Sequence, residues 1–167
     1  MAGRRIEPGP GQESVWDYPR PPVLRRATNE VRVEAHDGEL VAVTDAAVQV
    51  LETSHPPGWY LPMEAVADGR LRRSAARSTV CEWKGRATYW DLVLAGGEVV
   101  PQVGWSYEDP TPAFASIAGY VTFYPERVGR CLVDGEPVEP QPGDLYGGWV
   151  TPDVVGPFKG SPGTMLW

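Results

Sequence analysis

The stretch ATYWDLVL, residues 87–94, is the clearest predicted strand in this chain of 167 residues. Its aromatic and β-branched residues favour a β-strand. Because side chains alternate along a strand, Tyr89 and Asp91 are expected on one face, and Trp90 and Leu92 on the other. The face with polar tips suits the wall of a cavity, and the apolar face suits a core.

Short strands are predicted on both sides of this stretch. Gly96-Gly97 follows it and is typical of a turn, and Gly104 is expected to form a bulge. Alternating or continuous apolar patterns predict further strands at 30–35, 39–44, 47–52, 59–61, 98–103, 105–107, 120–124, 130–133 and 136–138. Residues 71–80 are expected to form a loop or an edge strand. Two short helices are expected at 62–67 and 112–118, each with a proline at its first position.

Composition supports the same fold class. The 19 glycines and 18 prolines disfavour a helix bundle, because both residues break helix interiors. The chain is therefore predicted to be all-β or β-dominated, a compact antiparallel sheet or a partly open, tent-like barrel with two short helices. We expect three parts: an irregular N-terminal arm at 1–29 that docks on the domain, a β-rich core domain at 30–138, and a wrapping tail rich in glycine, proline and aromatic residues at 139–167.

Charge and cysteine usage restrict the partners. A net charge of −7 disfavours binding to nucleic acid, and no apolar run approaches the roughly 20 residues needed to span a membrane. No apolar stretch follows Arg4 and Arg5, so no secretory signal is expected. Cys81 and Cys131 have no metal or redox spacing. These features predict a cytoplasmic protein with free thiols, no cofactor and no metal, present as a monomer or homodimer.

The segment Cys81-Glu82-Trp83-Lys84-Gly85 carries a thiol, a carboxylate and an amine within four residues. If it is extended, Cys81 and Trp83 share one face, and Glu82 and Lys84 the other. One interpretation is a pocket wall in which Lys84 acts as a base or electrostatic stabiliser and Cys81 as a nucleophile. The alternative is a buried cysteine, a core tryptophan and a surface ion pair.

A second candidate pair is Glu52 and His55. Glu52 continues the strand face of Val48 and Val50, so its carboxylate stands at the end of an apolar face. A glutamate and a histidine three residues apart can share a proton. The alternative is a loop histidine beside a solvated carboxylate.

Aromatic and polar residues around these segments predict a binding pocket. The candidate ligand-binding residues are Tyr60, Trp83, Tyr89, Trp105, Tyr107, Asp109 and Tyr124. The chain's two lysines, Lys84 and Lys159, each stand between an aromatic residue and a glycine. Because the chain otherwise uses arginine, these two positions indicate a need for the compact ammonium group.

Several of these segments together resemble the family called domain of unknown function 427, which is also labelled nucleotidyltransferase-like. The similar segments are Trp59–Pro62 with Glu52, Cys81–Gly85 with 87–90, Trp105–Pro110 and Ile117–Pro125, within residues 30–138. The flanks, with Glu13–Pro19 at one end and Gly147–Gly160 at the other, resemble a long form of the family. The resemblance implies a compact, mostly antiparallel β domain. Glu82 stands where the family's usual pattern has proline.

These observations predict a domain with one aromatic pocket for a small organic molecule. Acid–base or lysine- or cysteine-dependent chemistry is expected there, with Lys84, Glu52, His55 and Cys81 as the candidate catalytic residues. Nucleotidyl transfer is disfavoured, since the chain has no Asp-x-Asp pair to hold Mg²⁺. The alternative is a non-catalytic binding or protein-interaction module, suggested by the aromatic residues in both flanks.

Overall fold

The largest sheet surrounds the stretch at 87–94. The computed structural model describes residues 4–143 and 145–167. Its largest sheet has five strands: β7 (Leu71–Arg73), β8 (Val80–Cys81), β9 (Gly85–Val93), β10 (Val99–Tyr107) and β11 (Val121–Phe123). The order is β11-β10-β9-β7, β8 also pairs with β9, and all these pairs are antiparallel.

Two further antiparallel sheets lie beside the first. One has the order β13-β12-β3-β4 and comprises β3 (Val31–Ala35), β4 (Leu40–Thr44), β12 (Gly129–Val133) and β13 (Glu136–Pro137). The other has the order β2-β5-β6 and comprises β2 (Val23–Arg26), β5 (Val48–Leu51) and β6 (Gly58–Tyr60). A β-bridge between Leu61 and Val121 connects the end of β6 to β11. Residues that follow β6 are thereby held against the largest sheet.

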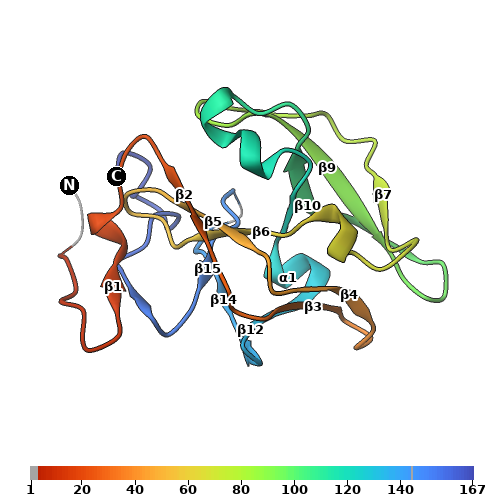
Figure 1. Cartoon of the computed structure of the whole chain (residues 1–167), viewed down its shortest axis with the longest axis horizontal. Coiled ribbons are helices and arrows are strands. Elements are labelled where there is room, and N and C mark those ends of the chain that lie inside the picture. The colour runs from red at the N-terminus through yellow and green to blue at the C-terminus, as the bar shows by residue number, and fades with distance from the viewer. Residues whose placement is uncertain (1–3, 144) are drawn as a thin grey trace.

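The remaining elements are short. The flanks pair as β1 (Glu13–Ser14) with β16 (Val154–Val155), in parallel, and as β14 (Glu139–Pro140) with β15 (Trp149–Val150). The helical elements are three 3-10 helices, η1 (Val15–Asp17), η2 (Met63–Ala65) and η3 (Pro112–Ile117), and one four-residue α-helix, α1 (Pro125–Val128). Figure 1 shows β1 and the C-terminal end on one side of the molecule, opposite the β9–β10 hairpin.

The main hydrophobic core lies where the sheets meet. Side chains from different sheets that are fully or almost fully buried fill it: Val31, Val33, Val41, Trp59, Leu61, Leu92, Val103, Val121, Phe123, Val128 and Trp149. Trp149 comes from the C-terminal segment, stacks on Trp59 at 5.9 Å between ring centroids, and donates its indole N–H to the carbonyl oxygen of Phe123. Burial of so large a side chain makes this segment part of the folded unit.

The predicted fold class is confirmed, since the chain is β-dominated and its sheets are mostly antiparallel. No closed barrel forms among the described residues. The bulge predicted at Gly104 lies two residues earlier in the chain, at Gln102. The irregular register lies between Val100 and Gly104, and Gln102, with a φ of 48°, donates its N–H to the Asp91 carboxylate. Gly104 itself pairs with both neighbouring strands, and a Cβ there would lie 2.3 Å from the Thr122 carbonyl oxygen.

The N-terminal segment is more regular than predicted. Residues 23–26 were read as part of an irregular arm, but they form β2, which pairs with β5 along its whole length. The residues Val-Leu-Arg-Arg show no clear alternation of apolar and polar side chains, so this strand forms because it pairs with β5. Helix α1 was also missed, although Pro125 begins it and Gly129, with a φ of 143°, follows it. Four residues are too few to show a helical period.

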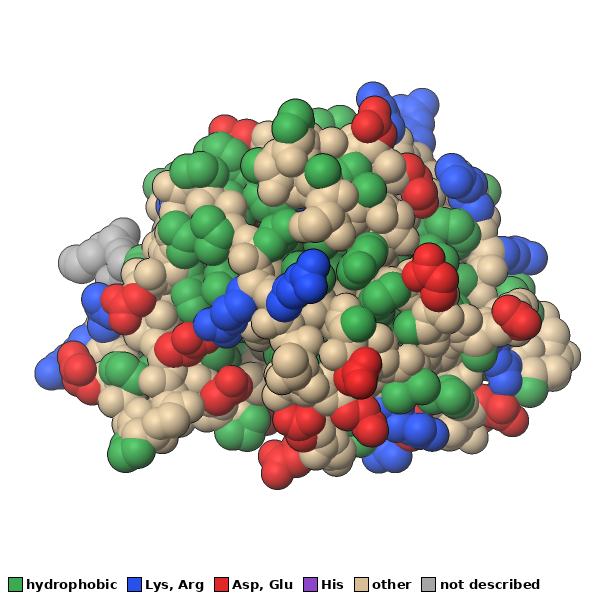
Figure 2. All heavy atoms as spheres, in the orientation of Figure 1, with side chains coloured by type: hydrophobic (Ala, Val, Ile, Leu, Met, Phe, Trp, Pro, Cys, Tyr) green, Lys and Arg blue, Asp and Glu red, His purple; other side chains and the backbone are tan. Residues whose placement is uncertain are grey.

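The surface carries charges of both signs. On the face in Figure 2, acidic and basic side chains are interspersed with hydrophobic ones. Within the described part of the chain, no helix has the length and apolar character that crossing a bilayer requires.

Candidate functional site

One cleft brings together ten of the eleven predicted site residues. Its volume is about 470 Å³, within the usual range of about 300–1,000 Å³ for ligand pockets. The ten residues are Glu52, His55, Tyr60, Cys81, Trp83, Lys84, Tyr89, Trp105, Tyr107 and Tyr124. They come from the loop after β5, from β6, the β8–β9 hairpin and β10, and from the position directly after β11. The fold thus gathers segments that are up to 72 positions apart in the sequence.

The segment at 81–85 reaches the cleft as a hairpin turn. We considered it extended, with its side chains alternating between two faces, but the structure places residues 82–84 in the turn that joins β8 to β9. Gly85 has a φ of 107°, a conformation that glycine adopts without strain. The Thr111 hydroxyl donates to the carbonyl oxygen of Trp83, and the Thr111 N–H donates to that of Lys84. The turn is therefore anchored to the segment before η3, and Cys81 through Lys84 all line the cleft.

Lys84 is the most enclosed charged group of the cleft. Its side chain is only 9% exposed, and its Nζ lies 5.8 Å from the ring centroid of Tyr107 and 6.0 Å from that of Phe114. The faces of aromatic rings attract a cation at this range. Among the described residues, no carboxylate lies within ion-pair distance of Lys84. The alternative of a surface ion pair with Glu82 is therefore wrong.

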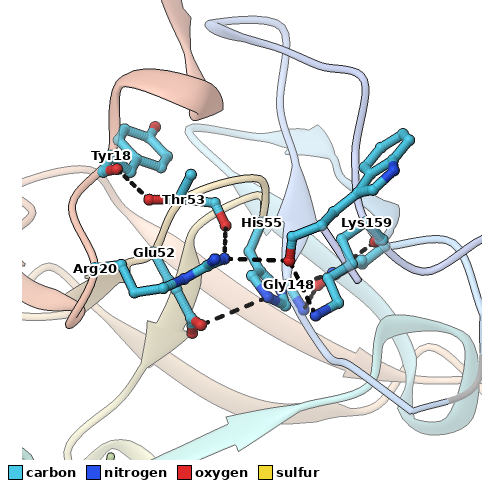
Figure 3. Close-up of polar contacts among 9 residues, drawn as sticks. Tyr18, Arg20, Glu52, Thr53, His55, Gly148 and Lys159 are labelled. Carbon is cyan, nitrogen blue, oxygen red and sulfur yellow. Dashed lines mark hydrogen bonds and ion pairs between the residues drawn. The ribbon is translucent and has the colours of Figure 1, made fainter. Parts of the chain in front are cut away.

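Glu52 and His55 face each other at one side of the cleft. Their Oε2 and Nε2 atoms are 3.8 Å apart, and Figure 3 shows the two side chains pointing toward one another. The side chain of His55 is 12% exposed and packs edge-on against the ring of Tyr146. Burial, together with the nearby cations Lys159, Lys84 and Arg20, lowers the pKa of His55 to about 4. The imidazole is therefore neutral at pH 7.

The C-terminal segment supplies a wall that the sequence analysis did not predict. Gln141, Tyr146 and Lys159 line the cleft together with Gly147-Gly148. Gln141 hydrogen-bonds His55, and the Nζ of Lys159 lies 5.5 Å from the ring centroid of Tyr146 (Figure 3 shows Lys159 beside His55). One signal was present in the sequence: Lys159 shares its aromatic-Lys-Gly context with Lys84, and both lysines line this one cleft. No local pattern marked Gln141.

Aromatic rings form most of the remaining wall. Trp105 packs against Tyr124 with ring centroids 4.7 Å apart, and Tyr60 against Tyr107 at 6.3 Å. Burial raises the pKa of Tyr124 to about 12 and raises those of Tyr60 and Tyr107 further, so all three phenols stay protonated at neutral pH. Thr122 also lines the cleft, and its buried hydroxyl has no hydrogen-bond partner among the described residues.

Asp109 is the one predicted site residue outside the cleft. It is exposed, beyond the end of β10. Asp91, expected on the same strand face as Tyr89, is also not in the cleft, because its carboxylate accepts the Gln102 N–H at the bulge. Across residues 4–143 and 145–167, no three His, Cys, Asp or Glu side chains are grouped to hold a metal ion.

A second cavity is slightly larger, about 530 Å³, and lies between β2, β13 and the segment around Pro152. None of the predicted site residues lines it. Of the two arginines that line it, Arg25 is already engaged by Glu13 and Gln49. The candidate site is therefore the smaller cleft, where the reactive side chains converge.

Comparison with known families gives one match. The family model described as a domain of unknown function (DUF427) matches residues 23–134, about two thirds of the chain. No curated protein matches the chain. The match begins at β2 and ends after β12, so it spans all three of the larger sheets except β13, and it leaves a flank on each side. Because the match covers more than half of the chain, the chain belongs to the DUF427 family.

Proposed function

We propose that the cleft binds a small organic molecule. One observation supports the proposal. Both lysines, the Glu52–His55 pair and at least six aromatic side chains line the same cleft of about 470 Å³. A concave site with mostly aromatic walls and a few converging polar groups is typical of small-molecule pockets.

The charge of Lys84 favours a ligand with an anionic group. A buried cation without a carboxylate partner is costly, and a bound anion would offset that cost. The aromatic walls favour a flat ring in the remainder of the molecule. The expected ligand is therefore a planar or aromatic anion, such as a carboxylate or a phosphate ester.

The same groups support acid–base chemistry on that ligand. Lys84 would stabilise negative charge that develops on the ligand, and Glu52 or His55 would exchange a proton with it. Cys81 is half-buried at the cleft and is the candidate nucleophile of the site.

The protein-interaction alternative has less support. It was motivated by aromatic residues in the flanks, and these contact the chain itself. Trp16 donates its indole N–H to the carbonyl oxygen of Pro157, and Trp149 is fully buried. Trp149 is therefore not available as a docking surface, and the indole N–H of the half-buried Trp16 is already used within the chain.

A thermal-shift screen tests the proposal. Wild type, Lys84→Met and the control Arg86→Met would be screened against aromatic carboxylates, nucleotides and aldehydes. Arg86 is exposed near the start of β9, two residues after Lys84, and does not line the cleft. A ligand at 100 times its Kd stabilises a protein by about 2.7 kcal/mol, which raises Tm measurably. The expected result is a shift in wild type and Arg86→Met that is lost in Lys84→Met.

Two outcomes would overturn the proposal: no compound shifts Tm, or the shift survives in Lys84→Met. Incubation of each stabilising compound with wild type and Glu52→Gln, followed by mass spectrometry, separates catalysis from binding alone. If wild type converts the compound and Glu52→Gln does not, the result would support acid–base catalysis in the cleft.

A further inference from the structure

The carboxamide of Gln141 connects three groups beside the cleft. Gln141 is 3% exposed, and its Oε1 accepts the backbone N–H of Gly148 at 3.1 Å. Its Nε2 lies 2.8 Å from the carbonyl oxygen of Lys159 and 2.9 Å from Nδ1 of His55. All its nearest polar contacts are thus within the protein.

These contacts allow only one orientation of the amide. The backbone N–H of Gly148 can only donate, so it requires the amide oxygen. The carbonyl oxygen of Lys159 can only accept, so it requires the amide NH₂ group. A flipped amide would place two acceptors together at Lys159 and two donors together at Gly148. The NH₂ group therefore has its second hydrogen directed at His55 Nδ1.

From this geometry we infer that Gln141 holds His55 in the neutral tautomer with its proton on Nε2, so that Glu52 is the proton acceptor of the cleft. The inference rests on the proposed function for its catalytic meaning. Nδ1 must present its lone pair to the Gln141 N–H, and Nε2 must then carry the hydrogen. A neutral ring in this state has no free lone pair with which to take a proton from a ligand.

The charges around His55 act in the same direction. Burial lowers the pKa of the imidazole most, and the cations Lys159, Lys84 and Arg20, which come from three separate segments, lower it further. The Glu52 carboxylate lies 3.8 Å from Nε2, and the ring of Tyr146 covers one side. The main-chain oxygen of the terminal residue, Trp167, accepts from Arg20 and Lys159, so these two cations are partly engaged there. A second proton would have to enter on Nδ1, against the NH₂ group of Gln141.

The roles of the two residues follow. The Nε2–H of His55 can donate a hydrogen bond to an oxygen of the ligand, and Glu52 has the lone pairs to accept a proton. In that step the bond between the proton and the ligand breaks, a bond to a Glu52 oxygen forms, and the electron pair stays on the ligand near Lys84. The ligand must therefore offer both an oxygen acceptor and an acidic proton.

Gln141 is a positioning residue, and it lies outside the family-matched region at 23–134. The C-terminal segment thus determines the protonation of a residue 86 positions earlier in the chain. Removal of the Gln141 amide would change the protonation of His55, but it would leave Lys84, Glu52 and His55 themselves in place.

Nitrogen-15 NMR of the two histidines of the unliganded protein tests the inference. His36 is exposed in the turn between β3 and β4 and serves as an internal reference. In wild type at pH 7, His55 is expected to show one tautomer, protonated at Nε2. In Gln141→Leu the donor is lost, and signals of the Nδ1–H form are expected. Gln141→Glu, whose carboxylate would accept from Nδ1–H, is expected to show the doubly protonated ring at higher pH than wild type.

An Nδ1–H or doubly protonated His55 in wild type at pH 7 would overturn the inference, and this measurement does not depend on whether either variant folds. An unchanged His55 spectrum in a folded Gln141→Leu variant would also overturn it. Because no ligand is present, these outcomes are independent of the Lys84→Met screen.

Discussion

Replacement of His55 by glutamine is expected to weaken the pH dependence of stability between pH 7 and pH 5. In the folded protein the pKa of His55 is about 4, against 6.5 for an ordinary histidine. Between these values the unfolded chain binds a proton that the folded chain does not. Acidification through this range therefore favours unfolding, and the stability present above pH 6.5 is progressively lost as the pH falls toward 4.

The two pKa values set the size of the effect. Proton linkage gives a loss of about 2 kcal/mol at pH 5 and of about 0.2 kcal/mol at pH 7, with a limit of about 3 kcal/mol below pH 4. The side chain is 12% exposed, so solvent screening reduces these values little. A loss of 2 kcal/mol is a large part of the stability of a domain of this size, about 5–15 kcal/mol.

Urea unfolding of wild type and His55→Gln at pH 7, 6 and 5, followed by tryptophan fluorescence, measures the effect. The quantity of interest is how the difference in unfolding free energy between the two proteins changes with pH. Glu13 and Glu34 have lowered pKa values, so their protonation also destabilises the folded protein on acidification. Both residues are present in wild type and in His55→Gln, so their contributions cancel in the difference between the two unfolding free energies. His36→Gln, at an exposed position, is the matched control. A difference between wild type and His55→Gln that stays constant from pH 7 to pH 5 would refute the reasoning.

Three further predictions concern stability and thiol access. Trp149→Ala removes a fully buried side chain and is expected to cost about 3–5 kcal/mol in urea unfolding at pH 7; a cost below about 1 kcal/mol would mean that the C-terminal segment is not part of the core. Gly129→Ala should destabilise by at least about 2 kcal/mol more than Gly135→Ala, because both have positive φ but only at Gly129 would a Cβ lie 2.3 Å from a main-chain oxygen; equal costs would contradict this. Iodoacetamide should label the folded protein once, at the half-buried Cys81, and not at Cys131, which is fully buried and has a raised pKa; mass spectrometry of native protein labelled at Cys131 would disprove it.

Most of the sheet could be predicted because its signals are local. Strands β3, β4, β5 and β9 each alternate apolar and polar residues or concentrate β-branched and aromatic ones, and turn residues separate them. The elements that were missed lack such a signal. Strand β2 exists because β5 offers it a free edge, and the paired segments of the two flanks are only two residues long.

The candidate site was predicted in its residues more fully than in its geometry. Lys84, Cys81 and Glu52 were singled out because reactive groups are rare on otherwise apolar or aromatic stretches. Their arrangement was not predictable, since the hairpin turn at 82–84 depends on Thr111, and Thr111 is distant in sequence.

The β-dominated fold, the family and the residue types that gather in the cleft are predictable from the amino-acid sequence, because periodicity, turns and motifs act over a few neighbouring residues. Which of these residues meet depends on the tertiary structure. The hydrogen bond from Gln141 to His55 joins positions 86 residues apart, and Lys84 and Lys159 reach the same cleft from different segments. Such contacts arise when buried polar groups must find partners as the sheets pack, and no local pattern encodes that requirement.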